Sequence, residues 1–258
     1  MRTNLLLNLT NLLLNLKRKI INKSSGDYLN NNPIFVALDT NDLNTARDLI
    51  HEIKPFIGGI KLGLEFFINC GIAGCHSMKD FDLPLFLDFK LHDIESTVTA
   101  ALKGIFSLEP QYTTLHISSG SGCLKASVNL KKELQSNTSL LGVTILTSFD
   151  DKTIEELGFG SSVKHSVDQL TSIAFASGLC GIVCSGNELK RIKETYDNKL
   201  KLIVPGIRSA DDNLNDQKRT IGPKEAINKG ADAIIIGRSI VQNKDPAKAA
   251  KNILEEIS

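Results

Sequence analysis

Pro84-Leu-Phe-Leu-Asp-Phe-Lys-Leu-His-Asp-Ile-Glu-Ser-Thr-Val98 begins as an apolar run typical of a buried strand and takes on charges where that run ends. Side chains two apart share one face of a strand, so Asp88 and Lys90 should point the same way at its carboxyl end, with Asp93 in the turn beyond. Charges removed from water must be paired and hydrogen-bonded. On spacing alone, Asp88-x-Lys90-x-x-Asp93 is compatible both with a functional site and with a solvated turn between strand and helix.

After Pro33 the chain alternates apolar, β-branched runs with amphipathic stretches of helical length, which predicts parallel β/α units. The expected strands are Ile34–Asp39, Gly58–Leu62, Leu85–Lys90, Thr113–Ile117, Leu140–Leu146, Gly181–Cys184, Leu202–Val204 and Ala233–Ile236. Expected helices include Asp42–Ile53, Ile94–Leu108, Leu124–Leu134, Val163–Ala176, Glu188–Tyr196, Pro223–Lys229 and Pro246–Ile257. An open doubly wound sheet would also alternate in this way, but eight units favour a closed barrel. We predict an α/β fold, a (β/α)8 TIM barrel forming a single domain over residues 33–258.

Residues 1–32 differ in composition from the rest of the chain. Leucine and asparagine dominate, and Lys17-Arg18-Lys19 follows the leucine-rich part. Leucines interrupted by asparagines, with the basic residues after them, fit neither a spanning helix nor a standard signal peptide. We expect a low-complexity N-terminal leader or extension, weakly helical or disordered, with contact to a membrane surface as the alternative.

The length, composition and net charge of the chain are those of an ordinary globular protein. The 258 residues are 41% hydrophobic with a formal net charge of +1, without the basic excess of a nucleic-acid binder. Five cysteines without a Cys-x-x-Cys pair argue against a secreted disulfide framework. Cys180 and Cys184 would share one strand face, as half of a metal site or, as we prefer, as small buried side chains. We expect reduced cysteines, no metal, no nucleic-acid or membrane partner, and a cytoplasmic location.

Charged and hydroxyl side chains recur where the expected strands end. Asp39 closes the first strand, Lys61 lies near the end of the second, and Thr147-Ser148 follows the fifth. Alone, Asp39 could cap the next helix and Lys61 could extend from the barrel mouth into water. TIM-barrel active sites collect at this rim, and an alternation of Asp and Lys along it favours a site.

The last two units carry residues suited to an anion. Pro205-Gly206-Ile207-Arg208 follows the seventh strand, Asp216-Gln217-Lys218-Arg219 lies in the loop beyond, and Gly237-Arg238-Ser239 follows the eighth strand. These loops frequently bind phosphate in TIM barrels. Gly237 permits close backbone approach, and Arg238 offers a planar, permanently charged fork to phosphate oxygens. We therefore expect a phosphate site.

The five histidines say less about function than the charged residues do. His92, in the charged turn, suits acid–base chemistry or a structural role, and we favour the structural role. His116 ends the fourth strand and is expected to line the pocket floor, whereas His51, His76 and His165 are expected at surface or packing positions. No spacing indicates a nucleophilic triad.

Seven motifs in order along the chain resemble those of the bacterial-type orotidine 5'-phosphate decarboxylase family. They are Val36-Ala37-Leu38-Asp39, Ile60-Lys61-Leu62-Gly63, Leu87-Asp88-Phe89-Lys90-Leu91-His92-Asp93-Ile94, Leu146-Thr147-Ser148, Val204-Pro205-Gly206-Ile207-Arg208, Asp216-Gln217-Lys218-Arg219 and Ile236-Gly237-Arg238-Ser239-Ile240. The resemblance runs from Ile34 to the C-terminus. The Asp-x-Lys-x-x-Asp core alone is less specific, because related barrel decarboxylases acting on sugar phosphates share it.

This resemblance implies decarboxylation of orotidine 5'-monophosphate to UMP and carbon dioxide, the last step of de novo UMP synthesis, without a cofactor. It implies that Lys90 protonates C6 of the pyrimidine within a charge network of Lys61, Asp88, Lys90 and Asp93. A fixed ammonium would stabilise negative charge developing at C6 and then donate its proton. Whether Asp88 destabilises the substrate carboxylate or mainly positions Lys90 stays open.

The resemblance also implies a homodimer in which Asp93, Ile94 and Thr97 reach into the partner's pocket. The other implied substrate contacts are Asp39 and Lys61 at the ribose, Thr147 and Pro205 at the base, and Arg208, Gln217, Gly237 and Arg238 at the phosphate. The loop from Arg208 to Arg219 is expected to close on bound ligand. Glu95-Ser96 departs from the proline and asparagine that the family more often has there.

Two other functions fit the sequence. One is a metal-dependent sugar-phosphate decarboxylase or aldolase on the same fold. The other is a barrel that only binds nucleotide, or half of a bifunctional assembly that docks through residues 1–32.

Overall fold

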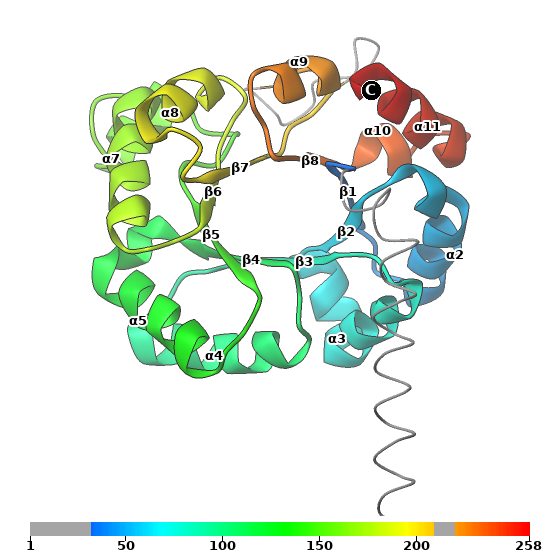
Figure 1. Cartoon of the computed structure of the whole chain (residues 1–258), viewed down its shortest axis with the longest axis horizontal. Coiled ribbons are helices and arrows are strands. Elements are labelled where there is room, and N and C mark those ends of the chain that lie inside the picture. The colour runs from blue at the N-terminus through cyan, green and yellow to red at the C-terminus, as the bar shows by residue number, and fades with distance from the viewer. Residues whose placement is uncertain (1–31, 209–219) are drawn as a thin grey trace, which may run out of the picture. The chain divides into compact units, whose positions relative to one another are not determined.

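The computed structural model describes residues 32–208 and 220–258, and in them eight parallel strands close into a barrel in sequence order (Figure 1). The strands are β1 (Ile34–Ala37), β2 (Gly59–Leu62), β3 (Leu85–Leu91), β4 (Tyr112–His116), β5 (Ser139–Val143), β6 (Gly181–Val183), β7 (Lys201–Val204) and β8 (Ala233–Ile236). Pairing of β8 with β1 completes the ring. The predicted (β/α)8 TIM barrel is confirmed.

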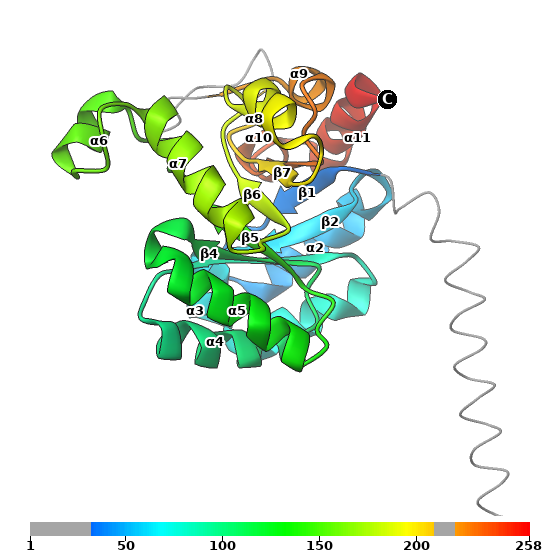
Figure 2. The same ribbon diagram turned by 60° about the vertical axis from the view of Figure 1, so that its left-hand side comes forward.

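The helices form the outer layer around the strands (Figure 1). They are α2 (Leu43–Ile53), α3 (Leu64–Ser77), α4 (Glu95–Ser107), α5 (Gly120–Glu133), α6 (Asp151–Glu156), α7 (Val163–Ala176), α8 (Leu189–Tyr196), α9 (Pro223–Asn228), α10 (Arg238–Val241) and α11 (Pro246–Ile257). Short 3-10 turns cover Lys54–Phe56, Met78–Phe81 and Ile117–Ser119. Figure 2 shows α6 projecting to one side of the barrel, just before α7.

Two apolar layers hold this arrangement together, because successive strand residues face opposite sides. Ile34 and Val36 of β1 face outward and belong to the large core between strands and helices. Phe35 faces inward, where its ring lies 6.3 Å from that of Phe86 and 5.5 Å from that of Tyr112. These three rings come from the amino-terminal parts of β1, β3 and β4 and form an aromatic floor of the barrel.

Several predicted boundaries are wrong by a few residues. β1 ends at Ala37 instead of Asp39, and β5 ends at Val143 instead of Leu146. β3 runs on to Leu91, with a shift in its register against β4 between Leu87 and Leu91. The early strand ends place the polar residues that follow β1 and β5 in loops at the barrel rim.

The predictions about the termini and the cysteines have mixed outcomes. The extension over residues 1–32 lies outside the described residues except for Asn32, so it stays a prediction. No helix within the described ranges is long and apolar enough to cross a membrane. All five cysteines are free; Cys184 is buried and Cys180 donates its thiol hydrogen to the Leu140 carbonyl oxygen, 3.2 Å away.

Candidate active site

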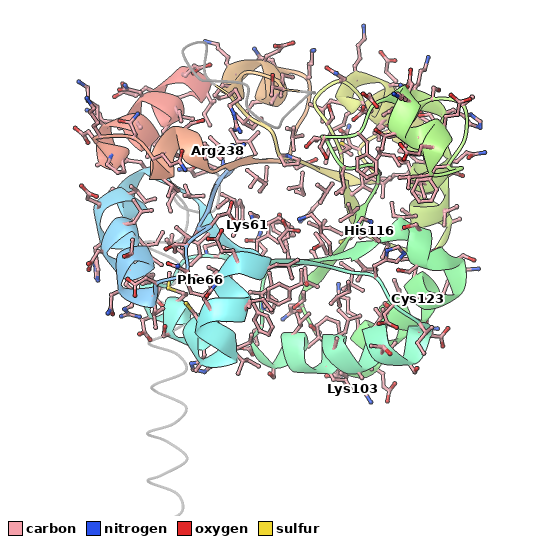
Figure 3. All side chains as sticks on the ribbon, turned by 180° about the vertical axis from the view of Figure 1, so that it is seen from behind. Lys61, Phe66, Lys103, His116, Cys123 and Arg238 are labelled. Atoms are coloured by element: carbon pink, nitrogen blue, oxygen red, sulfur yellow. The ribbon has the colours of Figure 1, made fainter. Side chains whose placement is uncertain are left out.

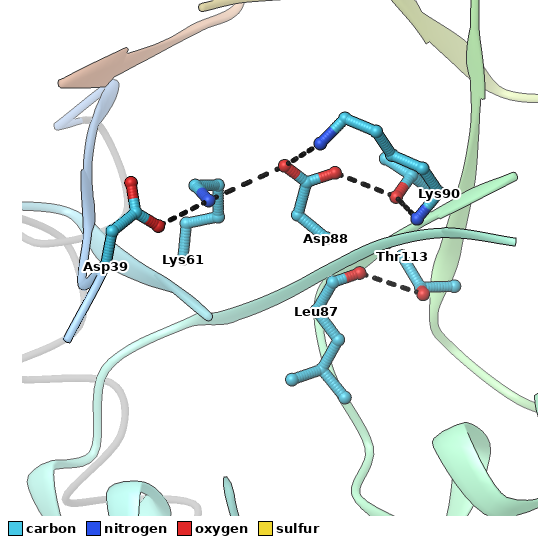
Figure 4. A network of polar contacts seen from close by, with 7 residues as sticks. Asp39, Lys61, Leu87, Asp88, Lys90 and Thr113 are labelled. Carbon is cyan, nitrogen blue, oxygen red and sulfur yellow. Dashed lines mark hydrogen bonds and ion pairs between the residues drawn. The ribbon is translucent and has the colours of Figure 1, made fainter. Parts of the chain in front are cut away.

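Four side chains of alternating charge follow one another across the carboxyl ends of β1, β2 and β3 (Figure 4). Lys61 Nζ lies 3.4 Å from Asp39 Oδ1 and 3.6 Å from Asp88 Oδ2. Lys90 Nζ donates to the same Asp88 Oδ2 at 2.8 Å. Lys61 and Asp88 are only 8% and 9% exposed, so each depends on its neighbours to balance its charge.

Asp88 is the centre of this charge chain. Burial raises the pKa of Asp88, but the charges of Lys61 and Lys90, with hydrogen bonds from Lys90 and Thr114, outweigh it and hold the pKa below its ordinary 3.8. The carboxylate is therefore ionised at neutral pH and fixes both ammonium groups.

Asp39 does not cap the next helix, and Lys61 does not extend from the barrel mouth into water. The cap of α2 is Asp42, whose Oδ2 accepts from the Thr45 N–H at 2.7 Å, and Asp39 pairs with Lys61 instead. Lys61 does not extend into water: Figure 3 shows it on the inner side of the barrel, whereas Lys103 lies on the outside of the helix layer.

A cavity of about 300 Å³ opens over the charge chain at the carboxyl ends of the strands. Its charged and polar lining residues are Asp39, Lys61, Asp88, Lys90, Thr147, Ser148, Arg208 and Arg238. The others are Pro205 and Gly237 in the loops and the apolar residues Ala37, Phe86, Val143, Ile145, Leu146, Val183, Cys184 and Ile235. Residues distant in sequence thus meet in one place, with a buried anion flanked by cations on one side and two arginines on the other.

Three of the expected site residues do not line this cavity. Asp93, Ile94 and Thr97 are exposed in the turn between β3 and α4 and at the start of α4. Asp93 Oδ1 accepts from the Ile94 N–H at 2.7 Å, so it is not a third member of the charge cluster within its own subunit. Gln217 lies outside the described residues.

The expectation that His116 lines the floor of this pocket is wrong. Its ring stacks on His92, with centroids 5.0 Å apart, and both line a separate cavity of about 410 Å³ beside α7. Burial lowers the pKa of His116 to about 4, assisted by His92 and Lys90 and opposed by Asp88.

Thr114 also belongs to this polar network, although the sequence did not indicate it. Thr114 of β4 is fully buried, and its hydroxyl donates to Asp88 Oδ1 at 2.9 Å. Threonine is a common strand residue, so no signal in the sequence distinguishes Thr114 from its neighbour Thr113.

The barrel and the charged cavity at its carboxyl rim define a (β/α)8 enzyme, because this is where barrels of this kind carry their active sites. Comparison with known proteins assigns the family: the chain belongs to the orotidine 5'-phosphate decarboxylase / HUMPS family, whose model matches residues 32–253. The family inferred from the seven motifs is thereby confirmed.

Curated relatives cover most of the chain. The orotidine 5'-phosphate decarboxylase of Wolbachia sp. subsp. Brugia malayi is 43% identical over 227 residues, which span 88% of this chain and 100% of the relative. That of Paramagnetospirillum magneticum is 40% identical over 231 residues, spanning 88% and 98%. The crystal structure of orotidine 5'-phosphate decarboxylase from Lactobacillus acidophilus superposes with a TM-score of 0.76 at 30% identity, covering 88% of this chain and 99% of that one.

Proposed function

We propose that this protein decarboxylates orotidine 5'-monophosphate to UMP and carbon dioxide, the last step of UMP synthesis, with Lys90 as the proton donor to C6 of the pyrimidine. The observation that carries the proposal is the ionised Asp88 held between Lys61 and Lys90 in the rim cavity. The curated relatives named above bear the name of this activity.

The proposed chemistry follows from the fixed position of the Lys90 ammonium. The side chain of Lys90 is 34% exposed and lines the cavity, while the side chain of Asp88 is only 11% exposed. As carbon dioxide leaves, negative charge develops at C6, and a preorganised ammonium stabilises that charge without reorganising solvent. The same group then transfers a proton to the carbanion. Of the two roles open for Asp88, the geometry favours positioning, because Asp88 bonds directly to Lys90.

The far side of the cavity suits the phosphate group. Arg208 and Arg238 follow β7 and β8 and both line the cavity with Gly237. A Cβ at position 237 would make ordinary van der Waals contacts, 3.6 Å from Ala37 Cβ and 3.9 Å from Asp39 Oδ2, so the backbone here lies close to the Asp39 end of the cavity. Because α10 spans only Arg238–Val241, the arginine charges rather than a helix dipole would hold the anion. Gln217 is proposed here on the resemblance alone.

The rest of the nucleotide would lie between these two ends. Asp39 and Lys61 would contact the ribose hydroxyls, and Thr147 and Pro205 the base. We further propose that the enzyme is a homodimer in which Asp93, Ile94 and Thr97 complete the partner's site, since these residues are exposed and do not line their own cavity. A cytoplasmic location stays a prediction.

The surface of α3 supports the dimer. Leu64, Ile68 and Ile72 are spaced four residues apart and are 55%, 76% and 54% exposed, and Ile94 is 69% exposed. Leu64 and Ile68 share one face of α3, and Ile72 follows the break in the helix at Gly71. Large apolar side chains exposed to this extent are typical of a protein–protein interface.

The test is direct detection of UMP and carbon dioxide from orotidine 5'-monophosphate in buffer treated with a chelator. We expect turnover without added metal. Activity that requires a divalent metal, or activity only on a sugar phosphate, would favour the same-fold alternative. Among the described residues, no group of three or more His, Cys, Asp and Glu side chains is placed to hold a metal ion.

The second test is Lys90→Ala, which should abolish nearly all turnover while the barrel still folds and still binds UMP. Lys103→Ala, at the exposed outer face of α4, is the matched control and should leave turnover unchanged. A Lys90→Ala variant as active as the control would refute the proposed proton donor.

A further inference from the structure

Thr114 lies directly beneath the charge chain, and its hydroxyl contacts two of the groups that the mechanism needs. The side chain is 0% exposed. Thr114 Oγ1 donates to Asp88 Oδ1 at 2.9 Å and accepts from the Lys90 backbone N–H, also at 2.9 Å. One hydroxyl thus joins β4 to both charged residues of β3.

The direction of these two bonds is fixed by chemistry. A threonine hydroxyl has one hydrogen, and an ionised carboxylate can only accept, so the hydrogen points to Asp88. The Lys90 N–H must then approach an oxygen lone pair. Asp88 consequently has both oxygens engaged, Oδ1 by Thr114 and Oδ2 by the two lysines.

The backbone of Lys90 explains why such a partner is needed. Lys90 has φ of 50°, in the left-handed region that a residue with a side chain seldom adopts, and β3 shifts register against β4 at this point. The shift takes the Lys90 N–H out of the regular strand ladder. Without the Thr114 hydroxyl this part-buried donor would lose its partner on β4, and the left-handed conformation would lose the bond that compensates for its strain.

We propose that Thr114 is a positioning residue of the reaction: its hydroxyl holds Lys90 in the left-handed conformation and Asp88 in its rotamer, so that the Lys90 ammonium is aimed into the cavity. Thr114 does not touch the substrate. It acts through the two residues that it fixes, and the inference therefore rests on the proposed decarboxylation by Lys90.

The neighbouring residue offers a matched control. Thr113 is equally buried, and its hydroxyl donates to the Leu87 carbonyl oxygen at 3.0 Å, on the other side of β4 and away from the charges (Figure 4). Thr113→Val and Thr114→Val make the same chemical change at adjacent positions of one strand. Only the second removes the support of Lys90 and Asp88.

The experiment compares steady-state kinetics of wild type, Thr114→Val, Thr114→Ser and Thr113→Val on orotidine 5'-monophosphate. We expect kcat of Thr114→Val to fall roughly 10- to 100-fold, because a small misplacement of a reacting group has an effect of that order. KM should change little, since the ribose and phosphate contacts stay in place. Thr114→Ser keeps the hydroxyl and should restore most of kcat. Thr113→Val should keep nearly all of it.

Three kinetic results would overturn the inference: a Thr114→Val variant with wild-type kcat, an equal loss in Thr113→Val, or no rescue by serine. If Thr114→Val does not fold, as judged by circular dichroism, Thr114→Ala removes the hydroxyl without adding a methyl group beside the carboxylate, and the same outcomes apply. A crystal structure of the variant should show Lys90 leaving the left-handed region; an unchanged φ would also contradict the inference. Wild type without any turnover would refute the proposed function instead, while that structural test of Thr114 would still stand.

Discussion

Lys61 is a lysine with almost no access to water, held between Asp39 and Asp88. Removing one member of such a cluster leaves an uncompensated charge, which typically costs about 3–5 kcal/mol. Replacing the whole cluster by apolar residues is often neutral for stability. The charges therefore depend on one another, and we expect replacement of the whole cluster by apolar residues to cost the barrel little stability, as for residues kept for chemistry.

Arg238 can be tested separately from the reacting end of the cavity. For Arg238→Ala we expect KM for orotidine 5'-monophosphate to rise on the order of 10- to 100-fold, since hydrogen bonds to a charged group contribute about 1.5–3 kcal/mol each. The reaction of phosphate-free orotidine should be affected much less, because that substrate cannot use the arginine. Steady-state kinetics on both substrates make the comparison, and an equal loss on both would argue against a phosphate contact.

His116 should make the stability of the protein depend on pH. The pKa of His116 is lowered from 6.5 to about 4, so between these values the unfolded chain binds a proton that the folded chain does not. The free energy of unfolding should therefore fall as pH falls from 6.5 to 4, by roughly 1–2 kcal/mol after allowance for partial exposure.

Urea denaturation at several pH values measures this slope. His116→Gln should flatten it relative to wild type, and the same substitution at the exposed His165 controls for loss of an imidazole. An unchanged slope in His116→Gln would show that other groups cause the pH dependence.

Among the elements, the strands were predictable and part of the site was not. The strands are largely apolar, as expected of parallel strands buried on both faces, and the charged residues Lys61, Asp88 and Lys90 lie in the later parts of β2 and β3. Helix α3 has a weak sequence pattern, because its apolar residues Leu64 and Ile68 are exposed and Gly71, with φ of 64°, interrupts it. The strand period correctly brings Asp88 and Lys90 together, but no periodicity predicts the left-handed Lys90.

The strand β2 depends on glycine at its start. A Cβ at Gly59 would collide with the ring of Phe35 in the aromatic floor. Gly59→Ala should lower the free energy of unfolding by about 1–3 kcal/mol, the usual effect of overpacking.

The same substitution at another glycine should raise the free energy of unfolding instead of lowering it. Gly104 lies within α4 with nothing near its missing Cβ, so Gly104→Ala should stabilise the protein by about 0.5–1 kcal/mol. Chemical denaturation of both variants measures the pair. An unchanged free energy of unfolding in Gly59→Ala would mean that the Phe35 ring can shift to accommodate the added methyl group.

At the scale of the whole molecule, the proposed dimer divides each site between two chains. Lys90 would come from one subunit and Asp93 from the other. Variants Lys90→Ala and Asp93→Ala should each be nearly inactive, yet a mixture of the two should recover activity when subunits exchange.

The recovery has an expected size. About half of randomly formed dimers are mixed, and each of these has one intact site of two, so about a quarter of wild-type activity should return. No recovery after complete exchange, verified with differently tagged subunits, would place Asp93 in the site of its own chain or outside any site.

The aromatic floor of Phe35, Phe86 and Tyr112 makes the barrel a cup rather than a tunnel. Substrate and product must therefore enter and leave through the same opening at the carboxyl rim of the barrel. A change that narrows the rim would lower the rate of substrate entry and the rate of product release together. The next substrate can enter only after the previous product has left.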